Sequence, residues 1–160
     1  MSGDGFLPVA PGPHFATLDE VRDRFVTHAP NVVQRERVFR GLEIWIEQAR
    51  DLYGSGRVWI DGGFVTHKAD APDDVDVAFL PDDRERATTA MASAHGLGLL
   101  TMQNLMCDIG SVARLQPVGG LVDAFLVDAD DDMDVENMTW LFSQVKGVKH
   151  VRKGFVEVVI

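Results

Sequence analysis

Between residues 32 and 53, apolar residues recur at intervals of three and four, the spacing of one face of an α-helix. The repeating positions are Val38, Leu42, Trp45, Ile46, Ala49, Leu52 and Tyr53. Gly54-Ser55-Gly56 then ends the pattern. A shorter helix is predicted over 18–28, because Thr17 and Glu20 have the spacing of a capping box. The chain therefore begins with two predicted helices.

Short β-branched and aromatic runs follow, and they predict strands separated by helical segments. The predicted strands are 57–60, 75–80, 121–127 and 155–160, with weaker signals at 97–102 and 112–116, and the predicted helices are 82–95 and 134–145. This order predicts a mixed α/β (α+β) fold in a single domain, 1–160. Residues 1–15, rich in proline and glycine, are expected to form an extended arm. The three tryptophans fall on apolar faces and are expected in the core.

Composition narrows the function classes. A chain of 160 residues with 46% hydrophobic residues can bury one core. The net charge of -10 disfavours nonspecific DNA binding. A single cysteine excludes an intrachain disulfide and a zinc site built on several thiolates. No signal-peptide pattern and no apolar run of about 20 residues is present, so a cytoplasmic protein without a membrane partner is expected.

Basic residues gather in two places, and each group is either a solvated face or a patch facing an anionic ligand. The groups are Arg35, Arg37 and Arg40, and then Lys146, Lys149, Arg152 and Lys153.

Two acids stand at the start of the predicted strand 75–80. Residues two apart on a strand share a face, so Asp74 and Asp76 would lie side by side while Val75 and Val77 enter the core. Paired carboxylates can hold two Mg²⁺ ions about 3.5–4 Å apart for in-line attack on a phosphoryl group.

Ten residues earlier, Gly62 and Gly63 follow a predicted strand. A turn without Cβ atoms lets backbone amides approach phosphate oxygens. A helix beginning near Phe64 would add its N-terminal amides to the same site.

Asp123 is the candidate for a third carboxylate, because it is polar within an otherwise apolar strand. It could instead face solvent or pair with an arginine such as Arg114. Asp61, Asp70 and Asp73 are interpreted as turn and N-cap residues. Each motif alone is more often a loop or a turn, and only the combination favours a metal site.

This combination resembles a known pattern. Ile60-Asp61-Gly62-Gly63, a gap of ten, and Asp74-Val75-Asp76-Val77 are similar to the signature of the DNA polymerase β-like nucleotidyltransferase superfamily. Further stretches resemble a family of small nucleotidyltransferase-like proteins of bacteria and phages: Leu7-Pro8, residues 13–18, 59–66 and 72–77, and 152–156. Together they span nearly the whole chain, and the central block is the most specific.

The resemblance implies a mixed sheet flanked by helices, with a nucleoside triphosphate over Gly62 and Gly63. Asp74 and Asp76 would bind two Mg²⁺ (or Mn²⁺) ions, while Asp123 would bind the catalytic ion and help deprotonate the acceptor. Lys153 would cover the triphosphate or the acceptor, or else belong to a solvated sheet edge. Most active members have serine where this chain has Gly63, so one phosphate contact is missing.

The expected function is magnesium-dependent transfer of a nucleoside monophosphate from a triphosphate to a hydroxyl of a small molecule, an RNA end or a protein. The chain has no room for a separate acceptor-binding domain, so a homo-oligomer or a protein partner would supply that surface. The alternative is a weakly active or inactive nucleotidyltransferase fold that serves as an interaction module, such as a phage effector or a toxin–antitoxin component.

Overall fold

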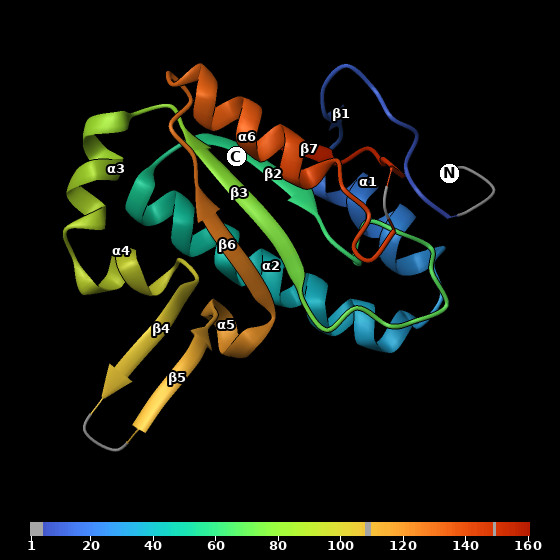
Figure 1. Ribbon diagram of the computed structural model, residues 1–160, viewed down its shortest axis with the longest axis horizontal. Helices are drawn as coiled ribbons and strands as arrows, with labels where there is room; N and C mark the ends of the chain where they lie inside the picture. The colour runs from blue at the N-terminus through green and yellow to red at the C-terminus, as the bar shows by residue number, and fades with distance from the viewer. Residues whose placement is uncertain (1–4, 108–109, 149) are drawn as a thin grey trace.

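The computed structural model describes residues 5–107, 110–148 and 150–160, and a five-stranded mixed sheet lies at its centre (Figure 1). The strand order is β1-β7-β2-β3-β6. The strands are β1 His14–Phe15, β2 Gly56–Asp61, β3 Val75–Pro81, β6 Val122–Leu126 and β7 Val156–Val159. The predicted α+β class is confirmed. Residues 1–4 of the predicted arm and Lys149 of the second basic group lie outside the described residues.

The sheet combines both strand directions. β2 runs antiparallel to its two neighbours, β3 and β7, whereas β3 and β6 run parallel to each other. Parallel neighbours need a long crossover. In its described residues, the crossover from β3 to β6 contains three short helices and a separate hairpin, and it brings two distant parts of the sequence side by side.

One face of the sheet is covered by the N-terminal helices. α1, Leu18–Arg22, carries the predicted capping box and continues as a π-helical turn, η1, Asp23–Thr27, before α2 spans Val32–Tyr53. The apolar stripe of α2 packs on the sheet residues that point toward it, among them Val58, Ile60, Val75, Val77 and Phe79. No helix within the described ranges is long and apolar enough to span a bilayer.

The opposite face is covered by α6, Asp132–Phe142, which lies across the sheet in Figure 1. A smaller core lies there, built from Trp59, Ala78, Leu80, Val127, Phe142 and Phe155. Trp140, expected in the core, is instead 59% exposed. The helix buries Phe142 against the sheet, and the Trp140 ring lies outside under the guanidinium of Arg152, 5.6 Å away.

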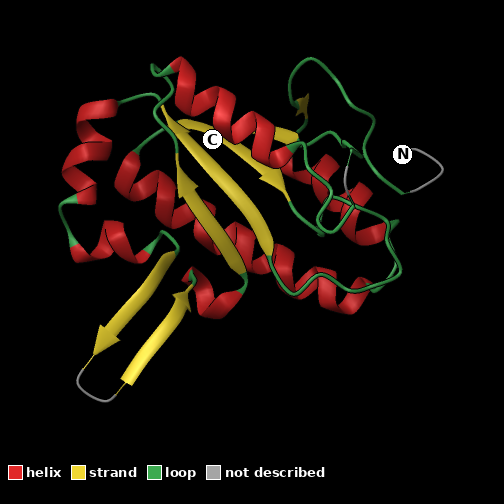
Figure 2. Ribbon diagram, viewed as in Figure 1, coloured by secondary structure: helices red, strands yellow, loops and turns green. Residues whose placement is uncertain are grey.

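Residues 82–102, predicted as one helix and one strand, contain two helices instead. α3, Arg84–Met91, is followed by a second helix, α4, Ala94–Gly98, so the predicted strand at 97–102 is wrong there. Ser93 explains the break, because its Oγ accepts a hydrogen bond from the Gly96 amide at 3.0 Å and caps the new helix. β4, Met102–Cys107, and β5, Gly110–Leu115, then form a hairpin that projects from the body (Figure 2), and α5, Pro117–Gly120, leads into β6.

Candidate functional site

A row of carboxylates crosses three adjacent strands. Asp61, the last residue of β2, lies opposite Asp76 of β3, and Asp76 lies opposite Asp123 of β6. Directly opposed residues point to the same face, with Cβ atoms about 4.5–5.5 Å apart. Asp74, two residues before Asp76, lines the same cavity as the other three. Asp61, Asp74, Asp76 and Asp123 are called the acid cluster below.

The alternation of each strand places the acids on the α6 side of the sheet. Val75 and Val77 enter the core beneath α2, as the sequence predicted, and Asp76 therefore shares the other face with Ala78. Asp61 follows Trp59 by two residues in the same way. The cluster thus lies where the smaller core ends, with apolar residues on one side and an open cavity on the other.

Two cations and one amide already contact the cluster. Lys153 Nζ pairs with Asp61, and both side chains are more than nine-tenths buried. Arg114 pairs with Asp123, and Gln116 Nε2 donates to Asp74 Oδ2 at 2.7 Å. No hydrogen bond to the Asp76 carboxylate is found among the described residues. Asp76 therefore lies between charged neighbours, and its carboxylate has no hydrogen-bond partner in the ranges that the structure describes.

One carboxylate oxygen of Asp123 accepts no hydrogen bond from the residues that the structure describes. Its side chain is 5% exposed, and Oδ1 is the only side-chain oxygen or nitrogen of the described residues that is fully buried without a hydrogen bond. A buried oxygen without a donor costs about 1–3 kcal/mol. A hard cation would satisfy it, and carboxylate oxygens are the ligands that Mg²⁺ prefers.

Burial raises the pKa of two members of the acid cluster. The pKa of Asp76 is raised to about 6, first by burial and then by the charges of Asp74 and Asp61, while Lys153 and Arg114 act in the opposite direction. The pKa of Asp61 is also raised to about 6, because burial outweighs the opposing effects of the Lys153 ammonium and the Gly62 amide. Buried like charges make ionisation unfavourable, and such groups gather where a ligand is to supply positive charge.

The glycine turn is shaped around Asp76. Gly62 has φ +81°, and a Cβ at this position would overlap Asp76 Oδ2. Only glycine therefore allows the carboxylate to lie against the turn. At Gly63 the nearest atom to an added Cβ is Pro72 Cβ at 3.8 Å, so a side chain fits there. The helix considered near Phe64 is absent: residues 64–66 form a turn, in which Thr66 Oγ1 donates to the Gly63 carbonyl at 2.7 Å.

A buried arginine holds this turn in place. Arg35 was grouped with a solvated or ligand-facing basic patch, but it is fully buried. Its guanidinium donates to the carbonyl oxygens of Phe64 at 2.6 Å and Thr66 at 2.7 Å, and also to those of Phe25 and Pro30. Arg35 lies three residues before Val38 and seven before Leu42, so the apolar period of the helix contained the signal.

The cavity above the cluster has a volume of about 540 Å³. Acids and the Gly62-Gly63 turn form one side, Lys68 and Lys146 add positive charge, and Phe125, Leu141 and Val145 supply an apolar wall. Hard oxygen ligands, a turn open to phosphate and an apolar surface are the groups that a metal-bound nucleotide needs. The described residues contain no three Asp, Glu, His or Cys side chains already gathered for coordination. The donor chemistry fits a divalent cation, and the side chains must move for it to bind.

All six residues singled out from the sequence line this cavity: Gly62, Gly63, Asp74, Asp76, Asp123 and Lys153. Lys153 is not on a solvated edge, since it is 5% exposed and paired with Asp61. Asp61 is not a turn or N-cap residue, because it ends β2 and is buried beside the other acids. Arg114 and Gln116 complete the lining of polar contacts around the acids. The sequence indicates Arg114 as one alternative partner of Asp123, and it gives no signal for Gln116.

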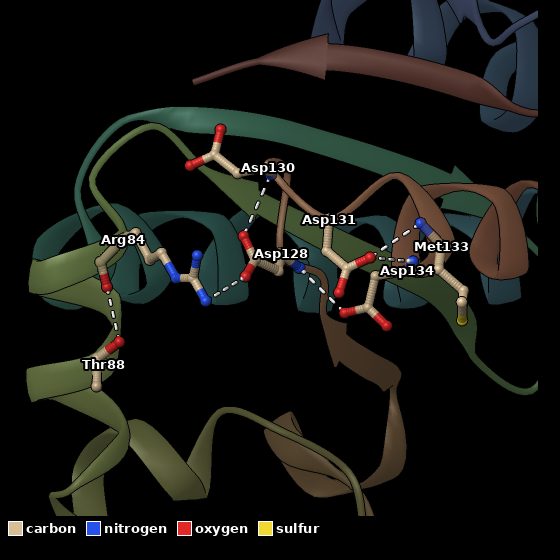
Figure 3. A network of polar contacts seen from close by, with 7 residues as sticks. All are labelled: Arg84, Thr88, Asp128, Asp130, Asp131, Met133 and Asp134. Atoms are coloured by element: carbon tan, nitrogen blue, oxygen red, sulfur yellow. Dashed lines mark hydrogen bonds and ion pairs between the residues drawn. The ribbon is translucent and has the colours of Figure 1, made fainter.

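A second acidic region lies beyond the other end of β6. Residues 128–134 are called the acid segment, and Asp128, Asp130 and Asp134 line a cavity of about 580 Å³. The polar contacts of the segment are made within it and with Arg84 of α3 (Figure 3). Asp128 pairs with Arg84 at 2.8 Å, and Asp131 Oδ1 accepts from the amides of Met133 and Asp134 as the N-cap of α6. These contacts cap a helix and leave no buried oxygen without a partner among the described residues.

The chain belongs to DUF6932, a family of unknown function whose sequence model matches residues 2–159. No curated protein and no solved structure matches the chain.

Proposed function

We propose that this protein is a nucleotidyltransferase that uses Mg²⁺ and moves a nucleoside monophosphate from a triphosphate to a hydroxyl acceptor. One observation carries the proposal: Asp123 lies opposite Asp76 across β3 and β6, with a buried oxygen that has no hydrogen-bond partner in the described part of the chain. The acids that the superfamily resemblance assigns to metal binding therefore share one face and one cavity.

Each side chain has a role that follows from its position. Asp74, Asp76 and Asp123 would hold the cations, which supply charge neutralisation for the phosphoryl group. Asp123, the most buried of the three, would also accept the proton of the acceptor hydroxyl. The amides of Gly62 and Gly63 would contact the triphosphate, because the turn leaves space there.

In this proposal, the buried Lys153 acts on the carboxylates of the acid cluster and not on the triphosphate. Its ammonium pairs with Asp61 and opposes the rise in the pKa of Asp76, so it favours the ionised form of both carboxyls from a buried position. The apolar wall at Leu141 and Val145 would take the base or an apolar part of the acceptor.

Calorimetric titration with each nucleoside triphosphate in the presence of Mg²⁺ tests the proposal. The wild type is expected to bind, and the double variant Asp74→Ala/Asp76→Ala is expected to lose binding. Asp128→Ala/Asp130→Ala is the matched control, since it removes two acids outside the cluster and should bind as the wild type does. Equal binding by both double variants, or no binding by the wild type, would refute the proposal.

An interaction module is the second candidate, and a specific observation favours it. Arg114 and Lys153 neutralise two of the four acids without any ligand, as in a structural ion-pair network. In that case Asp74→Ala/Asp76→Ala would leave every cellular phenotype intact while the protein stays folded. Loss of the phenotype in a folded double variant would exclude the module.

A further inference from the structure

One short segment contacts two members of the acid cluster. Arg114, near the end of β5, pairs with Asp123, and Gln116, two residues later, donates to Asp74 at 2.7 Å. Asp74 precedes β3 and Asp123 lies in β6, so residues 114–116 join two elements of the site. This segment is also where the β4–β5 hairpin meets the body (Figure 1).

The two partners in the Arg114–Asp123 pair differ in freedom to move. The Asp123 side chain is 5% exposed, whereas that of Arg114 is 43% exposed. The carboxylate is fixed within the central sheet between β3 and the rest of β6. The arginine reaches it from a two-stranded hairpin and can turn back to water without breaking the core.

A divalent cation and the guanidinium would compete for the same carboxylate. Both are positive, and both gain energy from Asp123 and from the neighbouring charge on Asp76. Placing them together on a buried carboxylate would add repulsion in a region of low dielectric. Among the described residues, no three acidic, His or Cys side chains are close enough to coordinate one cation. This agrees with an acid cluster whose charge is balanced by an internal counter-ion.

We propose that Arg114 is the internal counter-ion of the metal-free acid cluster, and that it must leave Asp123 before a divalent cation can bind. Residues 114–116 thereby set the cation affinity of the site. The inference rests on the metal site of the proposed function, but it concerns the cation alone and needs no nucleotide.

Binding of Mn²⁺ alone, followed by the electron paramagnetic resonance signal of the free ion at pH 8, tests it. Arg114→Gln removes the charge and keeps hydrogen-bonding groups. Arg84→Gln is the matched control, because Arg84 pairs with Asp128 outside the cluster. Arg114→Gln is expected to bind Mn²⁺ about tenfold more tightly than the wild type, equivalent to about 1.4 kcal/mol. Arg84→Gln should match the wild type.

A second variant guards against loss of folding. Arg114→Lys keeps the positive charge, and its affinity should lie nearer to the wild type than that of Arg114→Gln. Thermal melting in EDTA checks that each variant is folded. The double variant Arg114→Gln/Asp123→Asn should not show the increase in Mn²⁺ affinity that Arg114→Gln shows alone.

The outcomes are distinct. Equal or weaker Mn²⁺ binding by Arg114→Gln overturns the inference, as does the absence of binding in every variant. If Arg114→Gln binds Mn²⁺ more tightly but neither it nor the wild type binds nucleoside triphosphate, the inference stands and the nucleotidyltransferase proposal fails. If the wild type binds nucleoside triphosphate but Arg114→Gln binds Mn²⁺ no more tightly than the wild type, the nucleotidyltransferase proposal stands and the inference about Arg114 fails.

Discussion

The two acid-rich regions at opposite ends of β6 have similar composition and different structure. In the acid segment, residues 128–134, carboxylates cap α6 or pair with an exposed arginine, and each contact spans a few residues or reaches the adjoining α3. In the acid cluster, Asp61, Asp76 and Asp123 come from three strands and face one another beneath a cavity. One oxygen of that cluster is buried and accepts no hydrogen bond from any described residue.

The difference shows that a local density of negative charge is a poor guide to a binding site. Capping acids satisfy backbone amides and remain near water, which is a stable arrangement. Acids in register across a sheet repel one another and are desolvated together, which is favourable only when a cation joins them. The following variants test this contrast, from the largest expected effect to the smallest.

Arg35→Met should have the largest effect on stability. It would leave the carbonyls of Phe64 and Thr66 buried without a donor, and we expect a loss of about 3–5 kcal/mol. Arg84→Met, near the acid segment, should cost less than about 1 kcal/mol because the Arg84 pair is exposed. Urea denaturation of both proteins measures the difference, and similar losses would contradict the assigned role of Arg35.

Gly62→Ala should be the next most damaging. The added methyl would occupy the place of the Asp76 carboxylate at a residue with φ +81°, so we expect a loss of about 2–3 kcal/mol. The new Cβ at Gly63 has open space, and Gly63→Ala should lose less than about 1 kcal/mol. Chemical denaturation of the pair decides the matter, and equal stability would mean that Asp76 does not lie against the turn.

Asp76→Asn should stabilise the metal-free protein at pH 8 by about 1–2 kcal/mol. Folding raises the pKa of Asp76 from 3.8 to about 6, so its contribution to stability is present below pH 4 and is lost as the pH rises through 6. The advantage of the variant should therefore develop between pH 4 and 6 and persist above. Melting temperatures in EDTA across this range measure it.

Asp128→Asn, beyond the other end of β6, should destabilise the protein, in contrast to Asp76→Asn. It removes an ion pair with Arg84 and no crowding, so we expect a small loss at pH 8, below about 1 kcal/mol. If Asp76→Asn and Asp128→Asn both stabilise the protein at pH 8, the proposed difference between the acid cluster and the acid segment is wrong.

Gly63→Ser should have the smallest effect on stability, and it should strengthen the binding of nucleoside triphosphate. The space beside Gly63 admits the side chain, and the hydroxyl would restore the phosphate contact that the resemblance implies. We expect tighter nucleoside triphosphate binding by about 1 kcal/mol, close to fivefold. Calorimetry with Mg²⁺ measures this, with Gly63→Ala as the control for the added Cβ.

Much of the fold was visible in the sequence. The period of α2 and the capping box at Thr17 and Glu20 both appear in the structure as predicted. The common face of Asp74 and Asp76 also followed from local alternation, because both line one cavity while Val75 enters the core. The division of residues 82–98 into two helices was missed, since a single capping serine outweighed a continuous helical composition.

The sequence by itself determined the long helix α2, most strands and the glycine–aspartate spacing, because each depends on backbone geometry over a few residues. Only the tertiary structure decided which charges meet. Asp61 joins the cluster through strand register, and its partner Lys153 is 92 residues away in the chain. Arg35 reaches a turn 29 residues away. Such pairings depend on how the elements pack around the sheet, and no local period encodes that packing.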